Sequence, residues 1–335
     1  KRGNVGVSMV GPAADNLAHG AVICNNSFQN QGSNAIIVRN HVSSIVDSNS
    51  VDNILTNTSY ALLFQDCHDA MRVTRNTVYV TSGASCLGVT GFLGTNSNNA
   101  IIANNMLISN DDGQSNMLTT PMFIIDASYT KVLHNSIKLN APQRSGVAAA
   151  TFGGGEIDHC YFYNNIVAST DQSNYAFSYV PYEDNINYIG FNIYYSGSFL
   201  LNKYDGVNCN NLTAWRTHIN DANSQNGNTS FLSSTPTDLR SYSQQVKNHA
   251  FYFADVPTDI YGTQRDNVSP CVGAFEFLAL PYDFEIVGMV EPYDEYCDVP
   301  ASGAPLRLQI KNSGINTFIP GNGSSLNLTY SRATT

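Results

Sequence analysis

The chain has 335 residues and a formal net charge of −10, but only 13% of its residues are Asp, Glu, Lys or Arg. Soluble proteins average about 25% charged residues, and neutral polar residues, led by about forty Asn, take their place here. The scarcity of Glu, Lys and Arg argues against a helical bundle. A hydrophobic fraction of 42% excludes intrinsic disorder, and an acidic balance without a Lys/Arg cluster argues against a nucleic-acid partner.

No apolar run reaches the roughly 18 residues needed to cross a bilayer, so we expect no membrane insertion. The first residues, Lys1-Arg2-Gly3, include no initiator Met and suggest a processed product or a fragment of a longer protein. Seven cysteines show neither a C-x-x-C pair nor metal-ligand spacing. We therefore expect small buried thiols rather than a disulfide framework, and no metal site.

A short motif, apolar-x-x-Asn-x-apolar, recurs along the first two hundred residues. Its central residues are Asn26, Asn49, Asn76, Asn105, Asn135, Asn164 and Asn192. Successive copies are 23, 27, 29, 30, 29 and 28 residues apart. Such regular spacing indicates a repeat architecture.

A second apolar run of β type lies between consecutive copies of the motif. These runs are residues 35–38, 60–64, 86–89, 122–125, 147–150 and 175–179. Turn residues (Asn, Gly and Ser) separate the short strands and leave no room for a crossover helix. Coils of this kind bury their apolar side chains only by stacking on one another, which predicts a parallel β-solenoid.

The repeated Asn has a structural role in such a stack. Asn tolerates the left-handed backbone of a tight bend, and its amide both donates and accepts hydrogen bonds. Copies in successive coils would lie about 4.8 Å apart. We therefore predict that all seven motif Asn form a hydrogen-bonded ladder.

With this repeat, residues 20–200 resemble the secreted right-handed parallel β-helix proteins of bacteria, the pectate-lyase-like fold class. Further downstream, residues 259–265 (DIYGTQR) and 272–276 (VGAFE) resemble the closing motif of these proteins, D-x-D-G-x-x-R followed by G-A-x-E. Ile260-Tyr261 replaces the second Asp of that motif. The resemblance implies an all-β chain, with β-helix coils in residues 1–202 and the last coils and cap in residues 203–280.

The sequence character changes after Pro281. Residues 283–287 and 306–310 read as short strands, the second alternating apolar and polar side chains before an Asn-Ser-Gly turn. This segment resembles the first part of an immunoglobulin-like β-sandwich from adhesion proteins. Such a module needs about 100 residues, so we expect residues 281–335 to form an incomplete one, with further domains in the same larger protein.

Polysaccharide lyases of this fold class commonly combine a basic residue with carboxylates that hold calcium, which prefers six to eight oxygen ligands. The weak catalytic candidates follow runs of the second type: Asp66, His68, Asp69, Asp126, Glu156, Asp158 and His159. In-register coils would bring these groups together, whereas shifted coils would leave them as solvated turn residues. We expect no cofactor, with calcium as the exception if the carboxylates converge.

Aromatic residues crowd into residues 161–195. The position before the repeated Asn includes His134, Tyr163 and Phe191, and polar residues in its earlier copies suggest that it faces outward. Exposed rings beside amides suit a sugar-binding face, so these three are weak ligand-binding candidates. The alternative is that the rings pack against a loop or cap.

No nucleophile elbow, zinc-protease or nucleotide-binding motif is present in the sequence. We therefore expect a non-catalytic module of a large secreted or cell-surface bacterial protein, serving as a rigid stalk or as an adhesive surface that contacts a polysaccharide. The alternative is an extracellular polysaccharide lyase or glycoside hydrolase. A phage or viral receptor-binding fibre is a third interpretation.

Overall fold

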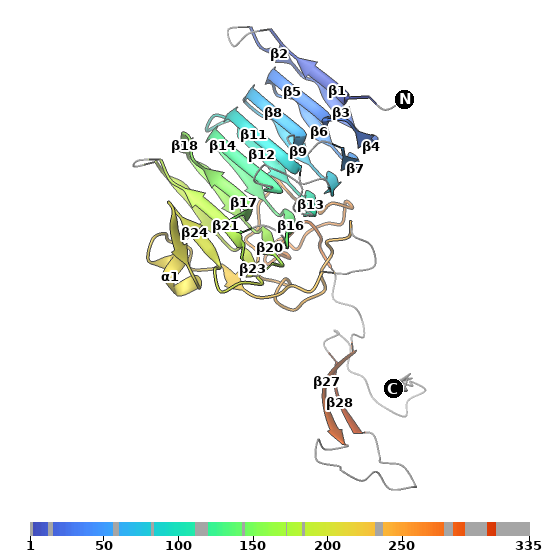
Figure 1. Cartoon of the computed structure of the whole chain (residues 1–335), viewed down its shortest axis with the longest axis vertical. Helices are drawn as coiled ribbons and strands as arrows, with labels where there is room; N and C mark the ends of the chain where they lie inside the picture. The colour runs from blue at the N-terminus through green and yellow to red at the C-terminus, as the bar shows by residue number, and fades with distance from the viewer. Residues whose placement is uncertain are drawn as a thin grey trace. The chain divides into compact units, whose positions relative to one another are not determined.

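The computed structural model describes residues 3–12, 16–55, 60–81, 84–110, 120–142, 145–171, 173–182, 185–231, 237–277, 284–291 and 307–312. The chain divides into two compact units, residues 1–276 and 277–335. The first unit is a parallel β-solenoid, as the repeat predicted (Figure 1). Within the described residues, no helix is long and apolar enough to cross a membrane.

Each coil of the solenoid contributes strands to three sheets, here called sheets A, B and C. Sheet A contains the second-type runs of the sequence, and its long strands lie side by side in Figure 1. Its strands are β1 (Val5–Val10), β2 (Ala18–His19), β5 (Asn34–Val42), β8 (Tyr60–His68), β11 (Ser85–Leu93), β14 (Met122–Ser128), β17 (Ala148–Gly153), β18 (Ile157–Asp158), β21 (Tyr175–Val180), β24 (Asn202–Tyr204) and β25 (Val207–Cys209). All pairings in this sheet are parallel except β24 with β25.

Sheet B carries the residues just before the repeated Asn, and sheet C carries those just after it. Sheet B comprises β3 (Val22–Cys24), β6 (Ile45–Asp47), β9 (Arg72–Thr74), β12 (Ala100–Ala103), β15 (Thr130–Leu133), β19 (Cys160–Tyr163) and β22 (Asn187–Gly190). Sheet C comprises β4 (Ser27–Gln31), β7 (Ser50–Ile54), β10 (Thr77–Val80), β13 (Met106–Asn110), β16 (Ser136–Asn140), β20 (Ile166–Ser169), β23 (Ile193–Ser196) and β26 (Gln225–Asn226). Their inward side chains form one continuous apolar core along the solenoid.

The turn between sheets B and C holds the Asn ladder. Asn76 shows the repeated pattern, because its N–H and Nδ2 each donate to Asn105 Oδ1 at 3.0 Å. The Asn76 amide also donates to the backbone oxygen of Val46, one coil earlier, at 3.0 Å. The ladder runs through Asn26, Asn49, Asn76, Asn105, Asn135, Asn165 and Asn192.

Two details of the predicted ladder are wrong. Asn165, and not Asn164, is the sixth member, because Phe162 and Val167 are the residues that align with the apolar positions of the preceding coil. The left-handed backbone belongs to the residue before each ladder Asn, which includes Arg75 (φ 55°) and Phe191 (φ 56°). Asn164 takes that position with a φ of 61°.

The chain closes the solenoid after residue 210. Helix α1 (Leu212–Arg216) begins at Asn211, whose side chain accepts the Ala214 N–H, and it places Trp215 in the core. Trp215 is fully buried and donates its indole N–H to Asp221 Oδ2 at 2.8 Å. Aromatic rings of the last coils pack edge-to-face on this indole.

Residues 246–276, here called the strap, then run back along the turn that holds the ladder. Their closing motif forms an internal network, in which Asp259 accepts the N–H groups of Tyr261, Thr263 and Glu276 at 2.8 to 3.0 Å. Arg265 Nη1 donates to Glu276 Oε2 at 2.9 Å, and both side chains are buried. The sequence resemblance identified these residues, and the structure shows that they hold the strap in shape.

The strap reaches several coils. Phe251 exchanges two hydrogen bonds with the Asn164 side chain, at 2.7 and 3.0 Å. Arg265 Nη2 donates to Asn104 Oδ1 at 2.7 Å, two coils away. Gly273 N–H donates to Asn164 O at 2.8 Å. The strap therefore joins coils that are otherwise linked only through their neighbours.

Cys24, Cys67, Cys86, Cys160 and Cys209 are free thiols, and all of them except Cys24 are buried. In the second unit, β27 (Phe284–Glu291) and β28 (Arg307–Asn312) pair antiparallel. The rest of the expected sandwich segment, including residues 313–335, lies outside the described residues.

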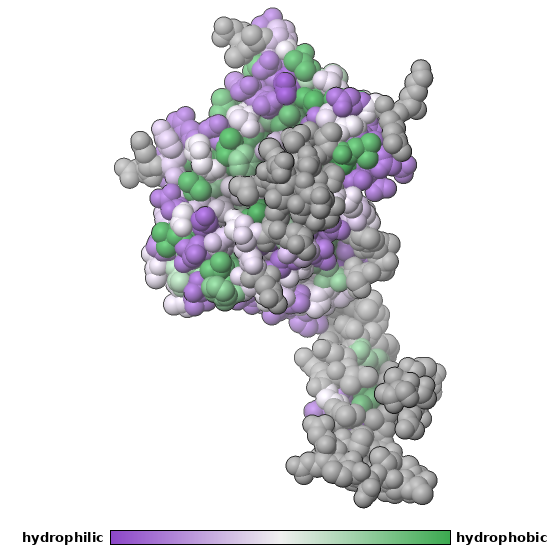
Figure 2. Space-filling model, in the orientation of Figure 1, coloured by the Kyte–Doolittle hydropathy of each residue, from purple (hydrophilic) through white to green (hydrophobic). Residues whose placement is uncertain are grey.

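Figure 2 shows hydrophilic residues interspersed with small hydrophobic groups on one face of the molecule.

Candidate functional site

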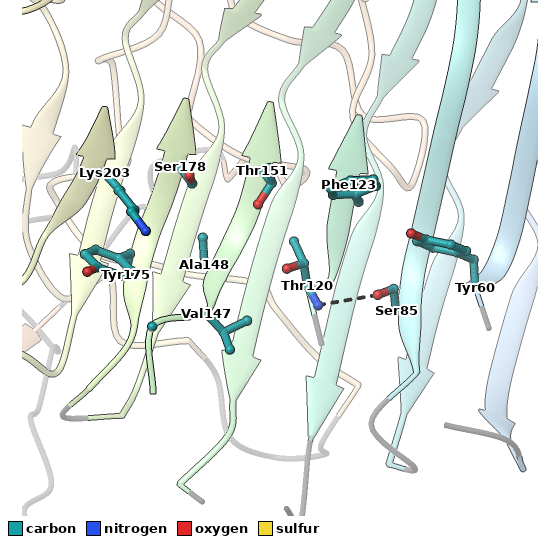
Figure 3. Close-up of a pocket in the computed structure, with 11 residues that line it drawn as sticks. Tyr60, Ser85, Thr120, Phe123, Val147, Ala148, Thr151, Tyr175, Ser178 and Lys203 are labelled. Atoms are coloured by element: carbon teal, nitrogen blue, oxygen red, sulfur yellow. Dashed lines mark hydrogen bonds between the residues drawn. The ribbon is translucent and has the colours of Figure 1, made fainter. Parts of the chain in front are cut away.

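The outer side of sheet A carries a groove of about 540 Å³. Figure 3 shows Tyr60 and Phe123 at one end and Tyr175 and Lys203 at the other, with small Ser, Thr, Ala and Val side chains between them. The lining residues are Tyr60, Ser85, Thr120, Phe123, Gly146, Val147, Ala148, Thr151, Tyr175, Ser178 and Lys203. Six strands, together with turn residues that precede two of them, thus contribute to one site.

Strand register places these side chains in line. Phe123 of β14 pairs with Thr151 of β17, which pairs with Ser178 of β21, which pairs with Lys203 of β24. Equivalent positions in neighbouring strands lie about 4.8 Å apart. The row therefore presents one side chain at each strand spacing across the floor of the groove.

A glycine makes room for the aromatic end of the groove. Gly88 of β11 pairs with Leu63 on one side and Phe123 on the other. A Cβ atom at Gly88 would lie 2.4 Å from Cδ1 of Tyr60, so any larger residue would displace that ring. The Tyr60 ring instead lies nearly parallel to Phe123, with centroids 6.3 Å apart and planes 25° apart.

The opposite end combines a ring with a cation. Lys203 Nζ lies 5.7 Å from the Tyr175 ring centroid. The Tyr175 hydroxyl donates to Asn208 Oδ1 at 2.7 Å, which fixes the ring at the rim of the groove. This end is therefore polar, whereas the Tyr60 end is mainly apolar.

The titratable groups among the described lining residues are Tyr60, Tyr175 and Lys203. Burial raises the pKa of Tyr60 and of Tyr175 above the usual value, so both remain neutral phenols at neutral pH. Among the described lining residues, Lys203 is the only charged side chain and none carries a carboxylate. Glycoside hydrolysis normally uses two carboxyl groups about 5 to 10 Å apart, and the described lining residues supply none.

None of the predicted catalytic candidates lines the groove. Asp66 and Asp126 both take left-handed conformations in sheet A strands, but β11 lies between those strands. Two strand spacings amount to about 10 Å. Gly91, between them, lies against Asp66, and Asp126 Oδ1 accepts the Glu156 N–H at 2.9 Å. Both aspartates therefore occupy left-handed bends of the coil, and Asp126 also accepts a backbone hydrogen bond there.

The remaining candidates lie where sheet A strands end: His68 and Asp158 are the last residues of β8 and β18, and Asp69 and His159 follow them. Asp158 Oδ2 and His159 Nδ1 lie 2.7 Å apart. Although burial opposes it, the hydrogen bond to His159 contributes to holding the pKa of Asp158 below its usual value. His68 and Asp69 belong to a coil three strands away from Asp158, which corresponds to about 14 Å. Across the parts of the chain that the structure describes, no three His, Cys, Asp or Glu residues form a group suited to a metal ion.

The three ligand-binding candidates lie beneath the strap. His134 is fully buried, so it offers no surface to a ligand. The Tyr163 ring packs edge-to-face on Phe253 at 5.8 Å, and the Phe191 ring lies 5.7 Å from Phe251. The alternative interpretation, that these rings pack against a cap, is the one that the structure supports.

Sequence reasoning missed the groove. The sequence feature that indicates it is the set of outward-facing positions in the second-type runs. These positions hold Tyr60, Phe123 and Tyr175 together with Ser and Thr, and one of them is Gly88. Recognising these positions requires the register between coils of unequal length.

Comparisons of the chain with protein-family models, curated proteins and solved structures find no match.

Proposed function

We propose that the chain is a non-catalytic module of a large secreted or cell-surface bacterial protein, and that its solenoid binds an extracellular polysaccharide in the groove on sheet A. The observation that carries this proposal is the lining itself. Aromatic rings stand at both ends, hydroxyl groups lie between them, and none of the described lining residues carries a carboxylate.

This combination suits a sugar chain. The apolar face of a sugar ring packs on an aromatic ring, while its hydroxyls exchange hydrogen bonds with short polar side chains. The hydroxyls of Thr151 and Ser178 form the floor of the groove between Phe123 and Tyr175. Rigid parallel strands hold all of these groups, so binding would require little ordering of the protein.

The test is binding of the full chain to a panel of bacterial and plant polysaccharides, followed by titration with oligosaccharides of the polymer that is retained. Phe123→Ala should weaken binding by about tenfold, as expected for the loss of one stacking ring. Tyr188→Ala is a matched control, because Tyr188 lies on sheet B and stacks on Tyr161 at 4.7 Å. Equal binding by both variants would refute the groove as the site.

The same polymers test the catalytic alternative. A lyase or hydrolase would release unsaturated products or new reducing ends from the retained polysaccharide. We expect neither, because the described lining offers no acid–base pair. If the wild-type chain released either product and Phe123→Ala did not, the groove would be a catalytic site and the proposal of a non-catalytic module would be refuted.

We further propose that residues 281–335 begin an immunoglobulin-like sandwich, so that the solenoid is one rigid segment in a series of domains. The antiparallel pair β27–β28 supports this proposal. A chain extended to about 100 residues beyond position 281 should gain cooperative unfolding of that module. Non-cooperative unfolding of the extended segment would contradict the proposal.

A further inference from the structure

A buried histidine lies where the strap meets the solenoid. His134 comes directly before the ladder residue Asn135, takes a left-handed conformation (φ 53°) and is fully buried. Its counterparts in the coils before and after it are Asn104 and Asn164, which have the same backbone conformation. Of these three side chains, only the imidazole of His134 can gain a charge near neutral pH.

The strap and the next coil together determine which ring nitrogen of His134 carries the proton. Phe251 N–H donates to Asn164 Oδ1 at 3.0 Å, and Asn164 Nδ2 donates to Phe251 O at 2.7 Å. These two bonds fix the orientation of the amide, because a backbone N–H only donates and a carbonyl oxygen only accepts. Asn164 Nδ2 also lies 2.9 Å from His134 Nε2. Since the amide nitrogen is a donor, Nε2 is the acceptor, and the neutral ring carries its proton on Nδ1.

The strap surrounds the ring with groups that bear on its charge. These are the Arg265 guanidinium, the carboxylates of Asp259 and Glu276, and the backbone carbonyls of Cys271 and Gly273. Burial and the nearby Arg265 hold the pKa of His134 well below its usual value, while the two carbonyls act in the opposite direction. Glu276 is paired with Arg265 at 2.9 Å, and Asp259 accepts three backbone N–H groups. Both carboxylates are therefore engaged within the strap.

The groups that face His134 from the solenoid are uncharged or already paired. His134 N–H donates to the backbone oxygen of Tyr163 at 3.2 Å, and burial raises the pKa of that phenol, so it stays neutral. Lys131, on the strand that leads to His134, is paired with Asp255 of the strap at 2.5 Å. Among the described residues, no carboxylate is hydrogen-bonded to His134. A protonated ring would therefore meet the Arg265 guanidinium without a carboxylate partner of its own.

We propose that the strap opens in response to acid, because a proton on His134 Nε2 breaks the hydrogen bond with Asn164 that supports the contact between solenoid and strap. The new N–H would point at an amide N–H of Asn164. That amide cannot reverse without losing both of its bonds to Phe251. Opening of the strap also uncovers the Tyr163 ring, which packs on Phe253 in the closed form.

Linkage gives the direction and the pH range of the effect. An imidazole in the open strap reaches water and titrates near its usual pKa of about 6.5, above the value in the closed form. The closed form is therefore fully favoured above that pH and loses stability as the pH falls below it. Between pH of about 7.5 and about 5.5, the equilibrium constant for opening should rise about tenfold. Unperturbed Asp and Glu side chains titrate below this range.

Hydrogen exchange of the full 335-residue chain measures this opening at single amides. The N–H groups of Phe251, Gly273 and Ala274 each donate from the strap to a group of the solenoid. Their protection factors, corrected for the intrinsic pH dependence of exchange, should fall about tenfold between pH of about 7.5 and about 5.5. The ladder amide of Asn76, outside the strap contacts, should keep its protection factor.

Two histidine variants supply the matched comparison. His134→Gln keeps an oxygen that can accept from Asn164 but takes up no proton, so the loss of protection at the strap amides should shrink to less than about twofold. His249→Gln removes an exposed histidine of the strap and should retain the tenfold loss. Circular dichroism checks that both variants are folded.

The imidazole nitrogen shifts of the wild-type chain give a second measurement that needs no variant. Nuclear magnetic resonance at pH of about 7.5 should show a neutral His134 with its proton on Nδ1. A proton on Nε2 at that pH would overturn the proposal. Strap amides of the wild-type chain that keep their protection at the lower pH, or an equal loss in His134→Gln, would overturn it as well.

Discussion

The ladder predicts a large loss of stability when an interior Asn is removed. The Asn135 side chain is fully buried and makes four hydrogen bonds. Its Nδ2 donates to Ile102 O and to Asn165 Oδ1, both at 3.0 Å, and its Oδ1 accepts from Asn105 N and Nδ2 at 3.0 and 2.9 Å. At about 1 kcal/mol for each bond, Asn135→Ala should lower the free energy of unfolding by about 4 kcal/mol.

Asn26 provides the comparison at the end of the same ladder. Its amide donates to Cys24 O and Asn49 Oδ1, both at 3.0 Å, from an exposed side chain. Water can replace these partners, so Asn26→Ala should lower the free energy of unfolding by only about 1 kcal/mol. Urea unfolding, followed by circular dichroism, measures both variants. Equal losses, or a loss below about 1.5 kcal/mol for Asn135→Ala, would refute the reasoning that buried ladder bonds stabilise the coils.

Three further predictions concern the strap and the closing end. Arg265→Met leaves the buried carboxylate of Glu276 without its cation, so thermal unfolding should show a loss of about 3 to 5 kcal/mol, and an unchanged melting temperature would contradict this role. Burial, with the charge of Arg265 nearby, holds the pKa of His134 well below its usual value. The free energy of unfolding should therefore be highest above a pH of about 6.5 and should fall as the pH drops below that value. In urea unfolding measured at several pH values, His134→Gln should flatten this dependence; the same pH dependence in both proteins would contradict this role of His134. Trp215 is the only Trp, and Asp221→Ala removes the acceptor of its buried indole N–H; we expect red-shifted fluorescence and a loss of about 2 kcal/mol, whereas an unchanged spectrum would argue that the indole is held by packing alone.

The solenoid could be predicted from the sequence because its repeat follows directly from physical requirements. Short strands separated by turn residues must stack, and a buried amide at each bend has partners only in neighbouring coils. The one misplaced ladder residue lies in the pair Asn164-Asn165, where both Asn fit the apolar spacing. The pairings of Val132 with Phe162 and of Ile137 with Val167 distinguish the two positions.

The groove and the strap depend on contacts that the sequence does not encode locally. In the sequence alone, Gly88 is a residue that would weaken its strand. The structure shows that Tyr60 of the preceding coil packs over it. His134 reads as an exposed turn residue, but the strap, more than a hundred residues later, buries it. The closing motif predicted a cap and gave no indication of which coils that cap covers.

The strap also changes how the solenoid should unfold. Stacked coils contact only their neighbours, so a simple solenoid can open one coil at a time from either end. Here residues 251–276 are bonded to Asn104, Ser136 and Asn164, which belong to three consecutive coils. We therefore expect those coils to unfold as one cooperative unit, which is complete only once residues 251–276 are in place. The coils of Asn26 and Asn49 lie outside these contacts and remain free to exchange their amides first.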